Sequence, residues 1–192
     1  YRTPVTLGHD LAGTVLRVGD AVRGFAPGDA VYARPRDHRI GAFAERIALD
    51  EADVAHAPTT ISTIEAASLP LVALTAWQAL VEMGGVQPGQ KVLIHAGSGG
   101  VGRAVADRLA PFGGELTVVA SSARTEDGVT VHGIDELATL LPDSDIVVLT
   151  LPGNAQTEGL FDATTHALLP DDALVVNVGD RKSTSELQSL AY

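Results

Sequence analysis

The sequence predicts an α/β protein, in which a parallel β-sheet with helices on both faces follows a small β domain. Two observations support this prediction. Through residues 91–178, short apolar runs rich in β-branched residues alternate with helical patterns, as in strands joined by crossover helices. Residues 1–50 instead alternate strand-like runs with glycine and proline turns. We therefore expect a β domain over residues 1–60 and a sheet domain over residues 61–192.

The composition is that of a globular protein. The chain has 192 residues, of which 45% are hydrophobic and 19% charged. The net charge of -11 argues against nucleic acid or an anionic membrane as a partner, because both would be repelled. The absence of cysteine excludes disulfides and thiolate zinc ligands, and it fits a reducing cytoplasmic location. The chain begins at Tyr1 without a methionine, as a fragment would.

The first fifty residues contain three strand-like runs separated by turns. They are GTVLRVG, GDAVYARP and GAFAERIAL, which begin at Gly13, Gly28 and Gly41. Gly24–Asp29 is predicted to be a turn that leads into a strand at Ala30–Ala33, and Gly41 is predicted to open the next strand. This pattern indicates a small barrel or sandwich.

A linking helix is expected over residues 71–83. Ser68-Leu69-Pro70 precedes it as a turn, and Gly84 follows its last residue. The helix is apolar, so we expect its single tryptophan, Trp77, to pack in the core.

A buried strand at Val92–Ala96 runs directly into glycines. Gly97, Gly99 and Gly102 then form the pattern G-x-G-x-x-G at the spacing of a dinucleotide-binding turn. A glycine at the second position lets the backbone approach a diphosphate closely, and the helix that follows points unpaired N–H groups at it. A glycine-rich turn without a ligand is the alternative.

The helix that this motif requires is predicted next. Val101, Val105 and Leu109 recur at four-residue spacing, and Phe112 continues the apolar stripe. A strand before the glycines and an amphipathic helix after them give the context of a Rossmann-like nucleotide site.

Further elements complete the predicted sheet. Strands are expected at Leu116–Ala120, Val129–His132, Asp145–Leu151 and Ala173–Val178, and helices at Ile134–Leu141 and Gly159–Leu169. Ligands of such sheets bind at the carboxyl ends of the strands. These ends lie at Leu151-Pro152-Gly153 and Asn177-Val178-Gly179.

The residues after Leu116–Ala120, the second predicted strand of the sheet, indicate which cofactor is preferred. An NAD site usually has a carboxylate about twenty residues beyond the glycines, where it accepts hydrogen bonds from the ribose. Here the chain has Ser121, Ser122 and Arg124, which can donate to a 2′-phosphate. We therefore favour NADP(H) over NAD(H). The alternative is that Arg124 is a solvated loop residue.

The first half of the chain resembles the zinc-less quinone oxidoreductases of the medium-chain dehydrogenase/reductase family. The resemblance rests on LGHDLAGTV from Leu7, GAFAER from Gly41, EAASLPLVALTAWQAL from Glu65 and QPGQKVLIHAGSGGVG from Gln87. It implies a GroES-like barrel, here partial, followed by an NADPH-binding domain. His9 stands in G-H-D, where the zinc branch has G-H-E. Without cysteines a zinc site is not expected, so we assign His9 a structural hydrogen bond.

The second half resembles the NAD(P)-binding domain of D-2-hydroxyacid dehydrogenases. The resemblance rests on GRAVADRLAPFG from Gly102, DELATLLPDSDIVVLTLPGNAQTEGLFD from Asp135 and ALLPDDALVVNVG from Ala167. The change of family falls near residues 97–103, which suggests a chimera. The resemblance implies cofactor contacts at Gly100, Val101, Leu151, Pro152, Val178 and Gly179.

The catalytic residues of that second family are not matched. The position of its arginine holds Asp180, and His132 and His166 are interpreted as structural. Ser183–Glu186 is predicted to cap a final helix. Catalytic residues therefore remain unknown.

Three functions are compatible with these patterns. The first is an NADPH-dependent oxidoreductase of quinone-reductase type, which transfers hydride to a quinone or an enone and which needs mainly proximity and orientation. The second is an NAD(P)-binding module without turnover. The third is a keto-acid reductase similar to D-2-hydroxyacid dehydrogenases. The incomplete barrel would leave sheet edges uncovered, and we therefore consider a homodimer in which a second chain covers them.

Overall fold

The computed structural model describes residues 5–96, 99–126 and 128–179, in two compact units. Unit 1 comprises residues 1–74 and unit 2 comprises residues 75–192. The division lies within the linking helix α2 (Pro70–Trp77). No helix in the described part of the chain has both the length and the apolar character needed to cross a bilayer.

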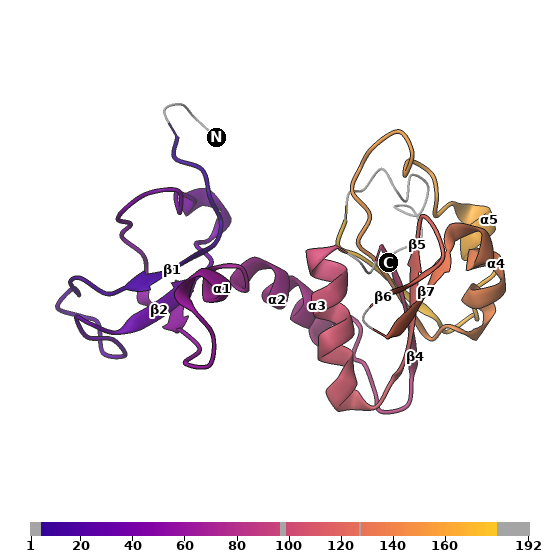
Figure 1. Ribbon diagram of the computed structural model, residues 1–192, viewed down its shortest axis with the longest axis horizontal. Helices are drawn as coiled ribbons and strands as arrows, with labels where there is room; N and C mark the ends of the chain where they lie inside the picture. The colour runs from indigo at the N-terminus through magenta and orange to yellow at the C-terminus, as the bar shows by residue number, and fades with distance from the viewer. Residues whose placement is uncertain (1–4, 97–98, 127, 180–192) are drawn as a thin grey trace. The chain divides into compact units, whose positions relative to one another are not determined.

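Unit 1 contains a three-stranded antiparallel sheet in the order β1-β2-β3. Its strands are β1 (Leu11–Thr14), β2 (Ala30–Ala33) and β3 (Val54–His56), and Figure 1 shows β1 and β2 side by side. The predicted turn before β2 is confirmed, because the Asp29 amide donates to the Ala26 carbonyl at 3.1 Å. The Asp29 carboxylate closes the same turn by accepting from the Ala26 amide at 2.8 Å.

The strand predicted to open at Gly41 does not form, and residues 41–49 are irregular. The Gly41 amide donates to the Gly8 carbonyl at 3.1 Å and the Phe43 amide to the Leu7 carbonyl at 2.9 Å, which is too short a pairing for a ladder. The sheet takes its third strand from β3 instead, after the short 3-10 helices η1 (Asp37–Arg39) and η2 (Glu51–Asp53).

Two helices end unit 1 and lead into unit 2. The first, α1 (Thr63–Ala67), was not predicted, and it begins at a capping box formed by Ser62 and Glu65. The predicted linking helix is confirmed as α2 followed directly by the π-helical turn η3 (Gln78–Met83). The interpretation of Trp77 as a core residue is wrong, because 45% of its surface is exposed at the end of α2.

Unit 2 is built on a six-stranded sheet in the order β6-β7-β5-β4-β8-β9. All neighbouring strands are parallel except β6 and β7, which are antiparallel. The strands are β4 (Lys91–His95), β5 (Glu115–Ala120), β6 (Arg124–Glu126), β7 (Val129–Gly133), β8 (Ile146–Leu149) and β9 (Leu174–Asn177). The α/β fold class is thus confirmed, with a small β domain before a mainly parallel sheet.

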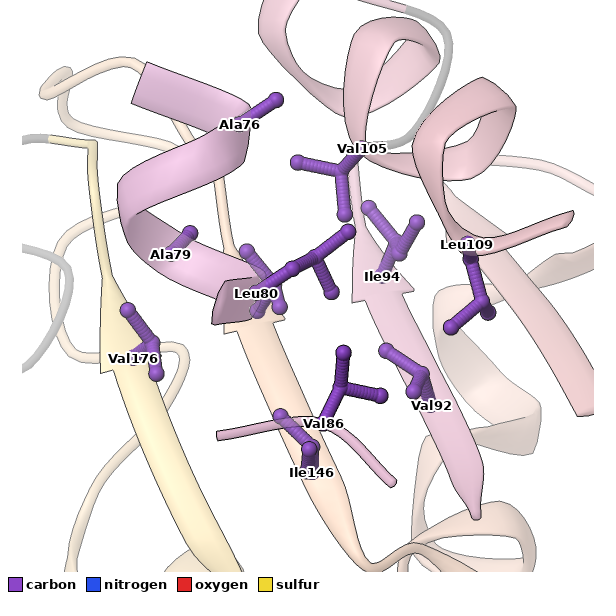
Figure 2. Close-up of a cluster of buried hydrophobic side chains, with 11 residues drawn as sticks. Ala76, Ala79, Leu80, Val86, Val92, Ile94, Val105, Leu109, Ile146 and Val176 are labelled. Carbon is purple, nitrogen blue, oxygen red and sulfur yellow. The ribbon is translucent and has the colours of Figure 1, made fainter. Parts of the chain in front are cut away.

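Helices cover both faces of this sheet. On one face, η3 and α3 (Gly100–Leu109), which continues into η4 (Ala110–Phe112), pack against β4, β8 and β9. Figure 2 shows this cluster, in which Leu80 and Val105 meet Ile94 of the central strand. The apolar stripe predicted on α3 is confirmed, since Val105 and Leu109 are 0% and 1% exposed.

The opposite face carries a second apolar cluster around Leu93, Val147 and Phe161. It is covered by η5 (Ile134–Glu136), α4 (Leu137–Leu140) and η6 (Leu141–Asp143), which together form the predicted helical segment. Successive residues of β4 therefore point to alternate faces, as strand geometry requires.

The last predicted helix is shorter than expected. Only α5 (Ala163–His166) is helical within residues 159–169. It starts late because the Asp162 carboxylate accepts a hydrogen bond from the Thr165 amide at 2.8 Å and so fixes the first turn there. The predicted helix at Ser183–Glu186 lies outside the described residues.

Candidate functional site

The chain turns from β4 toward α3 through Ala96, at the centre of the sheet. Ala96 has a φ of 65°, a left-handed conformation that costs a residue with a side chain about 1 kcal/mol or more. Its carbonyl accepts from the Gly99 amide at 3.1 Å, and the Gly99 carbonyl accepts the helical bond of Arg103 at 2.8 Å. Backbone strain of this kind is concentrated at ligand sites. The first glycine of the motif, Gly97, lies outside the described residues.

Thr150, at the end of the neighbouring strand β8, holds this turn in place. Its hydroxyl lies 2.9 Å from the His95 carbonyl oxygen and 3.0 Å from the Ala96 carbonyl oxygen. Its amide also donates to the His95 carbonyl at 3.1 Å. The strained residue is thus tied to a second strand by a side chain that the sequence analysis did not single out.

The predicted residues Gly99, Gly100, Val101 and Gly102 lie at the start of α3. A helix has N–H groups in its first turn without partners inside the helix, and they make this end favourable for an anion. Because Val101 packs against the apolar cluster, the backbone of this first turn is anchored to the sheet.

The other predicted contacts gather at the same edge of the sheet. Because β5, β8 and β9 run parallel to β4 and its neighbours, their carboxyl ends meet at the edge where the glycine turn lies. The residues that follow these three strands are Ser121 and Ser122, Leu151 and Pro152, and Val178 and Gly179. The predicted contacts that follow these three strands therefore lie at the same edge of the sheet as the glycine turn.

Gly179 lies against the backbone of Leu151. A Cβ atom on Gly179 would overlap the Leu151 carbonyl oxygen and would lie 2.8 Å from its amide nitrogen. The amides of Val178 and Gly179 both donate to the Leu149 carbonyl, at 3.0 and 3.1 Å. The ends of β8 and β9 are thus held close together, and only glycine fits at position 179.

Arg124 lies at the predicted strand end but is already paired with a carboxylate. Its Nε and Nη2 atoms donate to Glu126 Oε2 at 3.0 and 2.9 Å, and its Nη1 atom lies 3.3 Å from the Ser122 carbonyl oxygen. A carboxylate that does not directly follow β5, that of Glu126, is therefore present beside Arg124. Glu126 was overlooked because it comes after the residues directly following β5, and the antiparallel edge strand β6 brings it to Arg124.

His95, the last residue of β4, is a further residue of the site that was not predicted from the sequence. Its side chain is 2% exposed, and its Nδ1 atom has no hydrogen-bond partner among the described residues. Burial lowers its pKa to about 4, so the imidazole is neutral near pH 7. The sequence signal that could have identified His95 is the presence of one polar residue within the apolar run VLIHA.

The other histidines of unit 2 have structural contacts. His132 Nδ1 lies 2.9 Å from Glu136 Oε2, and this hydrogen bond, with a further one from the Gly133 amide, lowers the pKa of Glu136. The ring of His166 meets Phe161 edge-on, with 6.5 Å between the ring centroids. Within residues 5–96, 99–126 and 128–179, no group of three or more His, Cys, Asp or Glu side chains is placed to hold a metal ion.

Unit 1 has an apolar hollow of about 450 Å³ beside the G-H-D segment. Its lining residues are Leu7, Gly8, His9, Asp10, Phe43 and Leu71. The Asp10 carboxylate accepts from the Leu71 amide at 2.7 Å and so caps the start of α2. In the described part of the chain the buried Nδ1 of His9 has no partner, so the structural hydrogen bond expected there is not observed.

Two family profiles match the chain, one for each half. Residues 1–59 match the alcohol dehydrogenase GroES-like domain. Residues 67–188 match the NAD-binding domain of D-isomer specific 2-hydroxyacid dehydrogenases. Both resemblances found in the sequence are therefore confirmed.

Individual proteins match through both halves. The bovine (Bos taurus) mitochondrial NAD(P)H oxidoreductase RTN4IP1 is 32% identical over 191 residues, which are 97% of this chain and 44% of that protein. An alcohol dehydrogenase superfamily protein from Novosphingobium aromaticivorans is 32% identical with a TM-score of 0.76, over 90% of this chain and 55% of that one. A quinone oxidoreductase from Pseudomonas syringae pv. Tomato DC3000 is 26% identical with a TM-score of 0.76, over 93% and 57% of the respective chains. The chain thus spans about half the length of these relatives.

Proposed function

The chain belongs to the medium-chain dehydrogenase/reductase family, with a GroES-like domain followed by an NAD-binding domain, and we propose that it is an NADPH-dependent oxidoreductase of quinone-reductase type. The proposed reaction is hydride transfer to a quinone or an enone. The observation that carries the proposal is the turn from β4 into α3, which lies at the centre of a parallel sheet where the strand order reverses.

The residues at this sheet edge fit a dinucleotide. The first turn of α3, from Gly100 to Gly102, would hold the diphosphate, since Val101 anchors its backbone and Thr150 holds the preceding residue Ala96. The bends at Ser121–Ser122 and at Val178–Gly179 would hold the two ends of the cofactor. When bound, the nicotinamide supplies the hydride, and the role of this chain is to bind and orient it.

The second part of the proposal is that the chain prefers NADPH to NADH. It is supported by the hydroxyl groups of Ser121 and Ser122 and by the guanidinium of Arg124 beside them. The contact between Arg124 and Glu126 weakens this support, because the carboxylate neutralises part of the positive charge.

A quinone or an enone is proposed as the acceptor for two reasons. Relatives of this chain include proteins named NAD(P)H oxidoreductase and quinone oxidoreductase. Reduction of an activated double bond depends mainly on proximity and orientation to the nicotinamide, so it can proceed without a dedicated acid–base pair.

Two alternatives are each favoured by one observation. A keto-acid reductase is favoured by the match of residues 67–188 to the 2-hydroxyacid dehydrogenase profile. A binding module without turnover is favoured by the apolar side chains that unit 1 exposes, such as Phe43 at 77% and Leu7 at 56%, because a substrate site needs enclosing walls.

Cofactor oxidation with two acceptors separates these functions. We expect NADPH consumption with a quinone and none with glyoxylate. Consumption with glyoxylate alone would support the keto-acid reductase, and cofactor binding without consumption would support the module.

A pair of glycine variants tests the nucleotide site itself. Among the described residues, a Cβ at Gly99 meets just the Ala96 carbonyl oxygen, at 3.5 Å, so Gly99→Val should fold while its side chain blocks the diphosphate. Gly13→Val in β1, where a Cβ meets nothing within 4 Å, is the matched control. We expect loss of NADPH binding, measured by fluorescence titration, for the first variant only. Unchanged binding in Gly99→Val would refute the site.

The expected partners and location are also proposals. The homodimer is supported by the exposed apolar side chains of unit 1, and sedimentation velocity measures it directly. The cytoplasmic location is supported by the absence of cysteine, whereas the bovine relative is mitochondrial by name, so imaging of a tagged protein must decide between the compartments.

A further inference from the structure

Arg124 and Glu126 form a pair on the lateral edge strand of the sheet, and the Arg124 guanidinium also reaches the Ser122 carbonyl at the proposed 2′-phosphate site. Both residues belong to β6, the antiparallel edge strand, and they stand two residues apart on the same face of it. Figure 1 shows β6 beside β7. Both side chains are partly exposed, at 34% for Arg124 and 39% for Glu126, so a ligand can reach them.

The contacts of the Arg124 guanidinium leave two of its N–H donors available. Glu126 Oε2 accepts from Nε and Nη2, which is one edge of the planar group. The Nη1 atom donates to the Ser122 carbonyl at 3.3 Å. A guanidinium has five N–H donors and these contacts use three of them, so one N–H of Nη1 and one of Nη2 can still donate to a phosphate while Glu126 stays bound.

We infer that Glu126 is a specificity-determining residue that limits how strongly this chain prefers a 2′-phosphate over a 2′-hydroxyl. This inference rests on the proposed function, because it concerns the cofactor bound at the carboxyl edge of the sheet. Arg124 attracts the phosphate, and Glu126 both neutralises Arg124 and repels the phosphate.

Electrostatics sets the size and the direction of the effect. A unit negative charge about 6 Å from a phosphate monoester, which carries a charge of about -1.5, changes its affinity by about fivefold in surroundings close to water. NADH carries no phosphate at this position, so its affinity should change little when Glu126 loses its charge. Glu126 therefore brings the affinities for the two cofactors closer together.

The test measures dissociation constants for NADPH and NADH in Glu126→Gln and in the wild-type protein, at low ionic strength. Glutamine keeps the size of the side chain and can still accept a hydrogen bond from Arg124. We expect NADPH to bind about fivefold more tightly and NADH to change by less than about twofold. The gain should shrink with added salt, because the pair is exposed to solvent.

The matched control is Glu115→Gln. Glu115 is an exposed carboxylate at the opposite, amino end of β5, so this variant has the same change in net charge away from the site. An equal gain in both variants would overturn the inference, because the effect would then come from net charge. Equal changes for NADPH and NADH in Glu126→Gln would also overturn it.

The outcomes distinguish this inference from the function on which it rests. If the wild-type protein binds neither cofactor, the proposed function fails and the inference fails with it. If the wild-type protein binds both cofactors and Glu126→Gln keeps their ratio, only the inference fails. A thermal unfolding curve of Glu126→Gln confirms that the variant is folded in either case.

Discussion

The two units of this chain are stabilised in different ways. Among the described residues, the buried hydrophobic side chains of unit 1 are only Val31, Ala33 and Ala66, and all others belong to unit 2. Most exposed large hydrophobic residues belong to unit 1, namely Val5, Leu7, Leu16, Val18, Phe43, Ile47, Ile61, Ile64 and Leu74. Unit 2 is therefore built around apolar clusters, whereas unit 1 has little apolar core of its own.

Polar side chains connect the loops of unit 1 instead. Arg36 donates to both carboxylate oxygens of Asp53, with a shortest distance of 2.7 Å, and this ion pair lowers the pKa of Asp53. Glu51 Oε1 accepts from the amides of Arg23 and Gly24, at 3.0 and 2.5 Å. Exposed pairs of this kind contribute little each and are screened by salt. The comparison shows that the sheet of unit 2 can hold a site rigidly, while unit 1 depends on local polar links.

The largest effect is expected from truncation in the core of unit 2. Leu93→Ala removes a side chain that is 0% exposed and should lower the free energy of unfolding by about 3 kcal/mol. Val31→Ala in unit 1, where Val31 is 7% exposed, should cost about 1 kcal/mol. Urea unfolding followed by circular dichroism measures both, and the emission of Trp77, the single tryptophan, reports unit 2 separately. Equal losses would contradict the difference between the units.

The next effect concerns His95, a polar residue within that apolar core. Its pKa is about 4 in the folded chain and about 6.5 when unfolded, so below pH 6.5 the unfolded chain binds a proton that the folded chain does not. Stability should therefore fall by about 3 kcal/mol as the pH decreases from 6.5 to 4. His95→Leu should remove this part of the pH dependence, measured as the difference between the two proteins in urea unfolding. Identical pH profiles would show that His95 does not titrate in this way.

Thr150 is a polar link in unit 2 that is expected to serve binding more than stability. Thr150→Val removes the hydroxyl beside the Ala96 carbonyl, so the strained turn should lose its fixed geometry and NADPH should bind about tenfold more weakly. Thr150→Ser keeps the hydroxyl and should restore the affinity in the same titration. Because valine keeps the methyl group of threonine, unchanged affinity in Thr150→Val would contradict this role of the hydroxyl.

The smallest effect is expected at Asp10, which caps α2 from within unit 1. Asp10→Ala leaves the Leu71 amide without its acceptor and should lower stability by about 1 kcal/mol. Asp10→Asn keeps an acceptor oxygen and should retain most of this contribution, as judged by thermal unfolding. If both variants lose the same stability, the charge of Asp10 matters more than its hydrogen bond.

Much of unit 2 could be predicted from the sequence because its strands are continuous apolar runs. Val92 to Ala96 and Leu116 to Ala120 differ by only one residue from the ends of β4 and β5. The glycine spacing also placed Gly99 and Gly102 at the start of α3. Buried parallel strands and tight turns have strong local patterns, so tertiary contacts were not needed to find them.

The features that could not be predicted depend on contacts between distant segments. The strand expected at Gly41 does not form, and β3 is the strand that pairs with β2. The local sequence pattern does not show which of two segments will pair with a given strand. The links of Thr150 to His95 and of Asp10 to Leu71 join residues more than 50 positions apart. The pairing of Arg124 with Glu126 is close in sequence, but its importance follows from the edge strand that carries it.

Strand β6 also affects how this chain behaves at high concentration. It closes one side of the six-stranded sheet with three residues, two of which are charged. Open sheet edges recruit strands from other molecules, and charged side chains on them discourage such association. Removing the charge of Glu126 to sharpen cofactor choice would weaken this protection, so stricter selectivity is expected to come with a greater tendency to aggregate.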